Sequence, residues 1–560
     1  MKNIFSYVYN KCKQYTNRIF YTDINNTVTL HYAMFMSILL AFSDLLDSKL
    51  KNKEPYIVLI SGNFLFKTII FTYCFLTGTR LVLISPKFQL SEIVNIILSR
   101  AGTNVLLLDT HILFKIQEME EEEYINILGF FEHIDTTAHI MENLLENEKY
   151  NKNYSLSKIY NKGRANYESN PMMSASILSP GTSYESCIVN VPYQLFGKSM
   201  LALSYFMGLK PSDKVSVIAD FEFHPNIYTI LGLITGIHYV SFETEEETQS
   251  GEEIANAIKN SNHKPNVILI SSNKFKKVWD TVLLNTYSNR IFLLLSKCIV
   301  TKWITNMIIR LKVQKIFGKE VKKVHILNEE LGFHVLDILK KSKIMFSSSY
   351  GFLEQGNFLA FKDPELFGHK DYIYKSGGTL LRNNDMIFKN IFIDEDESYK
   401  VGKDITLGEI CLEEDILNNG MTSILRSEDL GFTIPNVLNQ GDRKYLYMYG
   451  RKQRDPVHNK MSLDLLEKSL KDTLLIRDCL VRRRNIHVNG TEVSYSYDVF
   501  IELREDLLDI TKANWQKVQN SIVALLLDVE DKFSIKIENH AILNFDGIRN
   551  VADKIQYYLI

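Results

Sequence analysis

The stretch Pro55-Tyr-Ile-Val-Leu-Ile60, together with the segments that follow it, decides the fold class. This β-branched run is followed by Asn63 and by an apolar segment of helical length that stops at Gly78. A second run of the same kind, Arg80-Leu-Val-Leu-Ile-Ser85, comes next. Strand, helix, glycine stop and strand in this order form the crossover unit of a parallel sheet. We therefore predict an α/β fold with mostly parallel sheets flanked by helices.

The same alternation continues along the first two thirds of the chain and then changes. Val105-Leu-Leu-Leu-Asp109 and Lys214-Val-Ser-Val-Ile-Ala219 predict further buried strands, whereas the polar stretch from Glu146 to Pro171 predicts a long surface loop. Beyond residue 450, an amphipathic helix over Leu463–Leu470 precedes a hairpin that turns at Asn489-Gly490. The pattern predicts a large domain over residues 1–449 and a small α+β domain over residues 450–560.

Composition narrows the class of protein. The 560 residues are 46% hydrophobic and 11% aromatic, which is enough to bury a large core. The 64 basic and 66 acidic residues give a formal net charge of −2, so no global charge attracts nucleic acid, and we expect no nucleic-acid partner. The cysteines are widely separated in the sequence, without the paired spacing of metal ligands, and we expect no disulfide framework in so large a chain, which favours a cytoplasmic location: Cys12, Cys74, Cys187, Cys298, Cys411 and Cys479.

Two apolar segments are long enough to be compared with membrane-spanning helices. Phe64–Gly78 is too short to span a bilayer, and Ile291–Leu311 is interrupted by three basic residues. We expect both to be buried helices and predict no transmembrane segment. Contact of the second segment with a membrane surface is the alternative. The residues after Met1 lack the apolar core of a secretory signal, so no targeting peptide is expected.

Four short motifs carry the chemistry. The first is Ser179-Pro-Gly181-Thr182-Ser183, in which small hydroxyl residues and a glycine follow the strand-like Ala175–Leu178. Backbone amides of such a loop can approach phosphate oxygens. The glycine patterns of P-loop nucleotidases and of dinucleotide oxidoreductases are both absent from the sequence.

The other three motifs supply an aromatic ring, two carboxylates and a guanidinium. Tyr350 and Gly351 end a predicted strand, and Glu354 follows one step later. A tyrosine ring can stack on a base, and a nearby carboxylate can hold Mg²⁺. Asp429, predicted in a polar turn between Gly420 and Gly431, can accept hydrogen bonds from ribose hydroxyls, and Arg451 offers a forked cation at the predicted domain boundary. Together these are the parts of a nucleotide site.

In order and character the segments resemble the adenylate-forming superfamily of acyl-CoA synthetases, peptide-synthetase adenylation domains and luciferases. Gly408-Glu-Ile-Cys-Leu412 and Phe223-His224 also match segments of that family. The resemblance implies an N-terminal AMP-binding domain with a mobile C-terminal lid. It also implies ATP or AMP and Mg²⁺ as cofactors, with coenzyme A or the phosphopantetheine of a carrier protein as a candidate acceptor.

The resemblance further implies the role of each residue. Ser179, Gly181, Thr182 and Ser183 would face the phosphates. Tyr350 would pack on adenine, with Gly351 next to it in the nucleotide site, Glu354 would hold the metal, and Asp429 and Arg451 would bind ribose. His224 would lie beside the acyl pocket, where it lines the pocket or acts as a base.

The departures from the family pattern are as informative as the matches. Cys187 and Ile548 stand where the family has two lysines, and Lys460 replaces a glycine of the face that forms the thioester. Losing one preorganised donor typically costs about 2.7 to 4 kcal/mol in the transition state. Arg549, beside Ile548, is the candidate substitute cation.

Two functions therefore stand side by side. The first is ATP-dependent activation of a small carboxylic acid as an acyl-adenylate, with transfer to a thiol or amine. The second is a catalytically impaired relative, a pseudoenzyme that binds a nucleotide, an acyl-adenylate or a protein partner.

Overall fold

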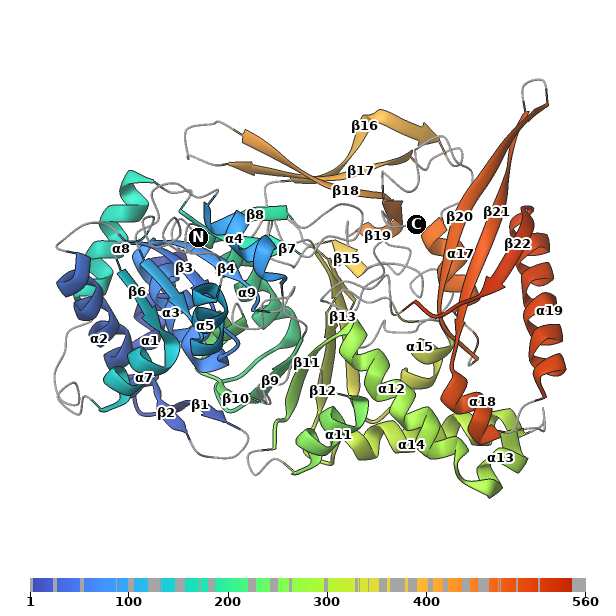
Figure 1. Cartoon of the computed structure of the whole chain (residues 1–560), viewed down its shortest axis with the longest axis horizontal. Helices are drawn as coiled ribbons and strands as arrows, with labels where there is room; N and C mark the ends of the chain where they lie inside the picture. Colours follow the sequence, from blue (N-terminus) through green and yellow to red (C-terminus); the bar gives the residue numbers. More distant parts are fainter. Residues whose placement is uncertain are drawn as a thin grey trace.

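The computed structural model is built on three sheets, of six, thirteen and three strands (Figure 1). It describes residues 4–23, 28–50, 55–86, 88–98, 105–118, 131, 133–146, 157–170, 173–179, 187–219, 228–241, 250–260, 264–296, 301–327, 331, 333–340, 342–351, 360–362, 378–380, 390–400, 406–415, 422–435, 444–451, 463–471, 473, 475–489, 492–511 and 514–545.

The six-stranded sheet has the order β6-β5-β3-β4-β7-β8 and contains the predicted crossover unit. Strands β3 and β4 are parallel, and α3 (Phe64–Thr77) connects them. The Asn63 side chain accepts a hydrogen bond from the first turn of α3, and Gly78, at a φ of 68°, ends the helix in the left-handed region. The α/β prediction is confirmed at this sheet. Its strands are β3 (Tyr56–Ile60), β4 (Arg80–Ile84), β5 (Val105–Leu108), β6 (His133–Thr136), β7 (Ser174–Ser179) and β8 (Cys187–Pro192).

The thirteen-stranded sheet has the order β16-β17-β18-β19-β15-β14-β13-β12-β11-β9-β10-β1-β2. From β1 to β13 its neighbouring strands are parallel, and from β13 to β16 they are antiparallel. The change of direction falls at β13, which carries the Tyr350 motif. The strands are β1 (Ile19–Asp23), β2 (Thr29–His31), β9 (Lys214–Ile218), β10 (His238–Ser241), β11 (Val267–Ser271), β12 (Lys323–Leu327), β13 (Met345–Tyr350), β14 (Ala360–Lys362), β15 (Gly378–Leu380), β16 (Asn390–Lys400), β17 (Thr406–Asp415), β18 (Thr422–Pro435) and β19 (Lys444–Arg451).

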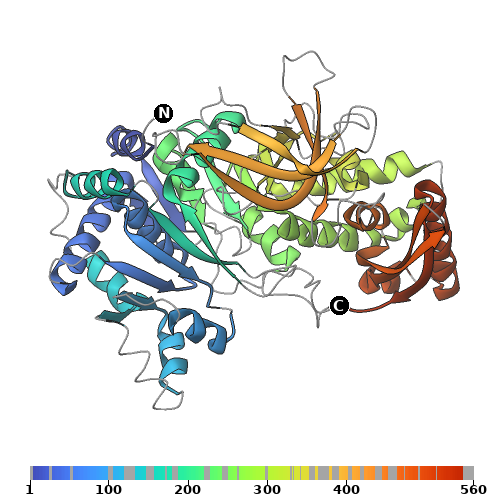
Figure 2. The ribbon, with the colours of Figure 1, turned by 90° about the horizontal axis from the view of Figure 1, so that it is seen from above.

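Helices cover these two sheets, as Figures 1 and 2 show. The main apolar core joins α1, α2, α3, α9 and α10 to the sheets, and a second core lies between α11, α12, α14 and the parallel strands. In the described part of the chain, no helix is long and apolar enough to cross a membrane. The helices are α1 (Ile4–Cys12), α2 (Tyr32–Leu50), α4 (Leu90–Leu98), α5 (Thr110–Gln117), α7 (Thr137–Glu146), α8 (Ser157–Ser169), α9 (Tyr193–Met207), α10 (Thr229–Thr235), α11 (Gly251–Asn260), α12 (Ser272–Tyr287), α13 (Arg290–Ser296), α14 (Lys302–Phe317) and α15 (Phe333–Leu339).

The three-stranded sheet of the C-terminal region has a core of its own. Strands β20 (Ile476–Asn489) and β21 (Glu492–Leu503) form the predicted hairpin, and β22 (Lys536–Ile542) runs parallel to β21. Its apolar face packs on α17 (Leu463–Leu470) and α19 (Trp515–Phe533), and α18 (Glu505–Thr511) contacts α12. The predicted boundary between residues 449 and 450 falls inside β19 and stays a prediction.

The surface loop predicted between Glu146 and Pro171 is wrong, because much of that segment forms α8. The buried face of α8 carries Ile159, Gly163 and Tyr167 at helical spacing. A glycine and a tyrosine do not stand out as apolar positions, so the sequence does not show the helical period of the buried residues. A Cβ on Gly163 would lie 2.1 Å from the Leu76 carbonyl oxygen, so the glycine lets α8 approach α3 closely.

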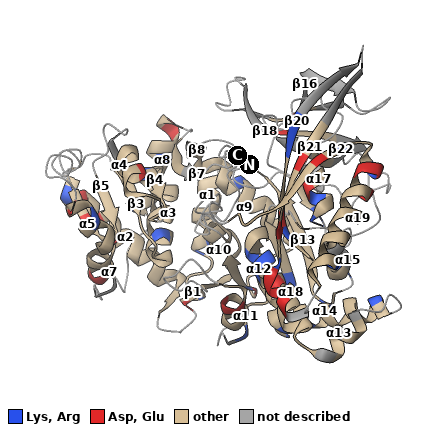
Figure 3. Cartoon of the chain, turned by 45° about the vertical axis from the view of Figure 1, so that its right-hand side comes forward, with Lys and Arg blue, Asp and Glu red and all other residues tan. Residues whose placement is uncertain are grey.

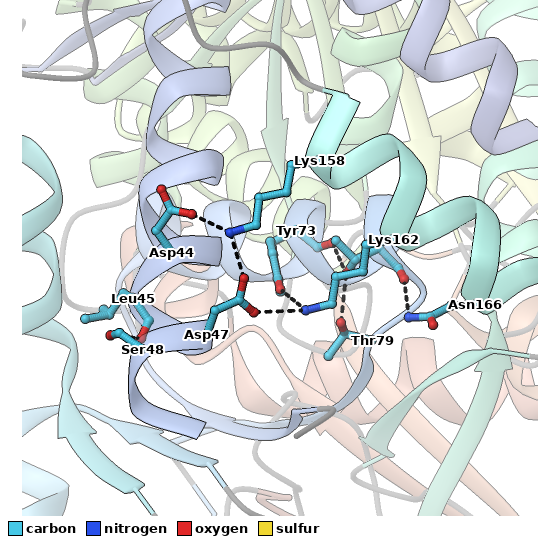
Figure 4. Close-up of polar contacts among 10 residues, drawn as sticks. Asp44, Leu45, Asp47, Ser48, Tyr73, Thr79, Lys158, Lys162 and Asn166 are labelled. Atoms are coloured by element: carbon cyan, nitrogen blue, oxygen red, sulfur yellow. Dashed lines mark hydrogen bonds and ion pairs between the residues drawn. The ribbon is translucent and has the colours of Figure 1, made fainter. Parts of the chain in front are cut away.

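Ion pairs hold the other side of α8 against α2 (Figure 4). Lys158 Nζ lies 2.5 Å from Asp44 and 2.7 Å from Asp47. Lys162 Nζ lies 3.5 Å from Asp47 and donates to the Tyr73 hydroxyl at 3.2 Å. The lysines that made this segment look like a solvated loop are therefore partners of α2 and α3.

The buried helix predicted over Ile291–Leu311 is also wrong in part. The segment contributes to two helices, α13 and α14, and several of its large apolar side chains are exposed. Ile309 is buried, but Ile291 and Trp303 are 70% and 66% exposed.

Candidate nucleotide site

The site begins at the carboxyl end of β13. Ser347, Ser348 and Ser349 are buried in the strand, Tyr350 is half-buried at its end, and Gly351 is buried just beyond it. β13 pairs with the parallel β12 on one side and the antiparallel β14 on the other. The predicted strand ending at the Tyr350-Gly351 step is confirmed. The last side chain of the strand thus stands where the sheet changes direction.

Tyr350 meets a residue that is far away in the sequence. Its hydroxyl donates a hydrogen bond to the Oδ2 atom of Asp429, which lies half-buried on β18. Asp429 is in register with Arg451, the last residue of β19. The structure therefore brings together three of the predicted site residues, although 101 positions separate Tyr350 from Arg451 (451 − 350).

Asp429 lies within a strand, so the prediction of a polar turn between Gly420 and Gly431 is wrong. The run Arg426-Ser-Glu-Asp429 looked like a turn because its residues are polar, but backbone pairing with β17 and β19 keeps it extended. The pairing with β19 shifts register between Leu430 and Gly431. A Cβ on Gly431 would lie 2.7 Å from the Tyr447 carbonyl oxygen, so only glycine allows the two strands to approach this closely.

Of the proposed phosphate loop, only the first residue, Ser179, is described, and it lies on β7 beside the edge strand of the six-stranded sheet. Ser179 ends β7 and pairs with Cys187, which begins the antiparallel β8. Gly181, Thr182 and Ser183 lie outside the described residues, as do His224, Glu354, Ile548 and Arg549. Among the residues that are described, no group of three or more His, Cys, Asp and Glu side chains is arranged to hold a metal.

A buried histidine behind the site was not predicted from the sequence. His325 on β12 is 0% exposed, and its two ring nitrogens lie 2.9 Å from the hydroxyls of Ser347 and Ser349 on β13. Its ring stacks on Phe361 of β14, with 5.5 Å between ring centroids. Burial lowers the pKa of His325 to about 3, so the imidazole is neutral at physiological pH. One serine therefore donates to the ring and the other accepts from it.

This histidine braces the strand that carries Tyr350. Side chains alternate along β13, so Ser347 and Ser349 face His325 while Tyr350 faces the other way. The alternating serines at 347 and 349 were the available signal, but the sequence does not reveal the register that sets His325 opposite Ser347.

Neither the protein-family models nor the curated proteins match this sequence. Solved structures do match it, over almost the whole length of this chain. The anthranilate CoA ligase AuaEII, in complex with anthranoyl-AMP, has a TM-score of 0.69 at 12% identity, covering 100% of this chain and 96% of that one. A benzoate CoA ligase from Burkholderia xenovorans LB400 has a TM-score of 0.66 at 12% identity, covering 100% and 99%. The O-succinylbenzoate coenzyme A synthetase MenE from Bacillus subtilis, in complex with ATP and magnesium ion, has 0.63 at 14%, covering 99% and 98%.

The chain has the adenylate-forming fold. The resemblance predicted from the spaced motifs is thus confirmed for the fold. Within this fold, Tyr350 at the end of β13 contacts Asp429 on β18, and Asp429 is in register with Arg451 on β19. Their roles toward a ligand, like those of the residues outside the described part, stay predictions.

Proposed function

We propose that this protein binds ATP and a carboxylic acid and joins them as an acyl-adenylate, with release of pyrophosphate. The acyl group then passes to a thiol or an amine. The observation that carries the proposal is the contact of Tyr350 with Asp429, opposite Arg451, in a chain with the adenylate-forming fold.

These groups suit a nucleoside. The Tyr350 ring offers a face for adenine, and stacking of a base on an aromatic ring contributes about 1 to 3 kcal/mol. The carboxylate of Asp429 already accepts one hydrogen bond from Tyr350, and a carboxylate has acceptor sites for several. Ribose hydroxyls are donors of that kind. Solved structures of similar fold hold anthranoyl-AMP, or ATP with magnesium ion, which supports the assignment.

The remaining parts of the machinery are proposed from the resemblance. Glu354 would hold Mg²⁺ against the phosphates, and Thr182 and Ser183 would contact them. Arg549 would replace the missing lysine cation, and His224 would border the acid. Apolar residues near Phe223 and Phe352 favour an aromatic or fatty acid, and coenzyme A or a carrier-protein phosphopantetheine is the proposed acceptor.

A second candidate function is nucleotide binding without turnover. It is favoured by Cys187, the first residue of β8, and by Ile548, because both stand where the resemblance implies a lysine. Two lost donors would cost roughly 5 to 8 kcal/mol of transition-state stabilisation if their effects add. The site would then bind its nucleotide but turn it over very slowly.

ATP–pyrophosphate exchange over a panel of aromatic and fatty acids, with calorimetry of AMP binding, tests both functions. We expect Asp429→Asn to weaken AMP binding about 10- to 100-fold, because it removes a charge-assisted hydrogen bond worth about 1.5 to 3 kcal/mol. Asp506→Asn, an exposed carboxylate on α18, is the matched control and should leave binding unchanged.

Exchange that needs an acid and is lost in Asp429→Asn supports the ligase. AMP binding without exchange for any acid overturns the catalytic proposal and supports the second function. Absence of AMP and ATP binding in the unmodified protein overturns both.

A further inference from the structure

The outer surface of α13 and α14 carries large apolar side chains that no described element covers. Ile291 and Leu294 on α13 are each 70% exposed. On α14, Trp303, Met307 and Leu311 are 66%, 37% and 49% exposed. We call these five residues the α13–α14 patch. Figure 1 shows the two helices along the lower margin of the molecule, with α13 at its corner.

The patch is a regular feature of α14 and no accident of a frayed end. At about 100° per residue, Trp303, Met307 and Leu311 lie along one stripe of the helix, four residues apart. The buried stripe, Thr305, Ile309, Val313 and Phe317, lies on the opposite side and packs in the second core. A surface helix normally carries polar side chains on its outer face. α14 is instead apolar on both faces.

The charges within the segment that carries the patch are all of one sign. Residues 281–319 contain no aspartate or glutamate, whereas the chain as a whole has a formal net charge of −2. On α14, Arg310 and Lys312 flank the apolar stripe. Lys315 lies on the same face as the stripe, one turn beyond Leu311. Figure 3 shows these helices as a mostly tan edge beside α18, which carries red. The basic residues of the segment are Arg290, Lys297, Lys302, Arg310, Lys312, Lys315 and Lys319.

We propose that the α13–α14 patch docks on the surface of a bilayer that contains anionic lipid. Apolar side chains and a tryptophan enter the boundary between headgroups and acyl chains, and the flanking lysines and arginine meet the lipid phosphates. The sequence prediction left membrane contact of this segment as an alternative to burial, and the exposure of the patch favours contact.

The sign of the charge argues against a second copy of this chain as the occupant. A symmetric dimer through the patch would bring the segment against its own copy, with seven basic residues and no acidic ones on each side. An anionic lipid surface provides the opposite charge over the whole patch. This proposal does not depend on the proposed ligase activity.

Sedimentation of the full-length protein with vesicles tests the proposal. We expect binding to phosphatidylcholine vesicles that contain 30% phosphatidylserine, and at least about fivefold weaker binding without the anionic lipid. Lys312→Glu and Lys315→Glu should each weaken binding about fivefold or more, because each basic side chain near an anionic surface contributes about 1 kcal/mol. Trp303→Gln should weaken it further than Trp515→Gln, which alters another exposed tryptophan, on α19.

The three tryptophans of the chain locate the contact. Trp279 is buried, and Trp515 is 51% exposed. In the variant Trp515→Phe, Trp303 is therefore the exposed tryptophan whose fluorescence is measured. Its emission should shift to the blue on vesicle binding, and the shift should be absent in Trp303→Phe. Absence of vesicle binding, or equal binding by Trp303→Gln and Trp515→Gln, overturns the proposal. A concentration-dependent dimer that Trp303→Gln abolishes also overturns it, in favour of a second copy.

Discussion

At the scale of single residues, His325 gives the site a measurable pH dependence. Burial lowers the pKa of its imidazole from 6.5 to about 3 in the folded chain. Between pH 3 and pH 6.5, His325 therefore binds a proton in the unfolded chain but not in the folded chain. The stabilisation by neutral His325 is therefore complete above about pH 6.5 and is lost as the pH falls toward 3, by about 1.4 kcal/mol per pH unit.

The variant His325→Gln isolates this effect, since a glutamine amide can donate to one serine and accept from the other but does not titrate. We expect the wild-type Tm to exceed that of the variant at pH 7.5 and the difference to narrow between pH 6.5 and 4. Thermal unfolding followed by circular dichroism measures it, with the exposed His540→Gln as control. A difference that is constant over this range would contradict the protonation argument.

Single residues also mark the limit of what this sequence predicts. Tyr350, Asp429 and Arg451 could be chosen from the sequence because their side chains suit a nucleoside, and the structure brings them together. The contacts of His325 could not be predicted, because they depend on the register of two strands 18 residues apart (345 − 327). Residue type carries chemistry, but register is set by the packing of the sheet.

At the scale of elements, α8 makes a testable case of close helix packing. A Cβ on Gly163 would meet the Leu76 carbonyl oxygen at 2.1 Å and the Phe5 ring at 2.8 Å. Alanine favours a helix over glycine by about 1 kcal/mol, but a clash with backbone cannot be relieved by a change of rotamer. We expect Gly163→Ala to lower the free energy of unfolding by about 1 to 3 kcal/mol.

Urea denaturation of the full chain measures this change. Arg164→Ala, at an exposed position of the same helix, is the matched control and should alter the midpoint little. A midpoint for Gly163→Ala equal to or above that of the unmodified chain would show that α8 does not pack as closely as described.

Elements were predictable where burial follows a simple period. The strands β3 and β4 and the helix α3 are apolar almost throughout, and their positions agree with the sequence prediction. The predictions for α8 and for the Asp429 segment of β18 are wrong for one shared reason. Their buried or paired positions are occupied by glycine and polar residues, so hydrophobic periodicity could not reveal them.

At the scale of the whole molecule, the C-terminal sheet is tied to the large N-terminal part by an ion pair. Arg504, the residue between β21 and α18, has Nη2 2.8 Å and Nε 3.0 Å from Asp280 Oδ1 on α12. The side chains are 15% and 26% exposed, so solvent screens the pair incompletely. Arg504 also donates to the Ile476 carbonyl oxygen, which fixes the guanidinium against β20.

Removal of one partner leaves a half-buried charge without its counterion. We therefore expect Asp280→Asn to loosen the contact of α18 with α12, with amides of α18 exchanging their hydrogens about 5- to 20-fold faster, which corresponds to about 1 to 2 kcal/mol. Hydrogen–deuterium exchange with mass spectrometry measures this. Because Asp506→Asn changes a carboxylate on α18 itself without touching the pair, it controls for a general effect on that helix.

The double variant with exchanged charges, Asp280→Arg with Arg504→Asp, should recover part of the protection if the attraction between the two charges holds the units together. Unchanged exchange in Asp280→Asn would instead assign the contact to the apolar packing around it, and the arrangement of the two units would then not depend on this charge pair.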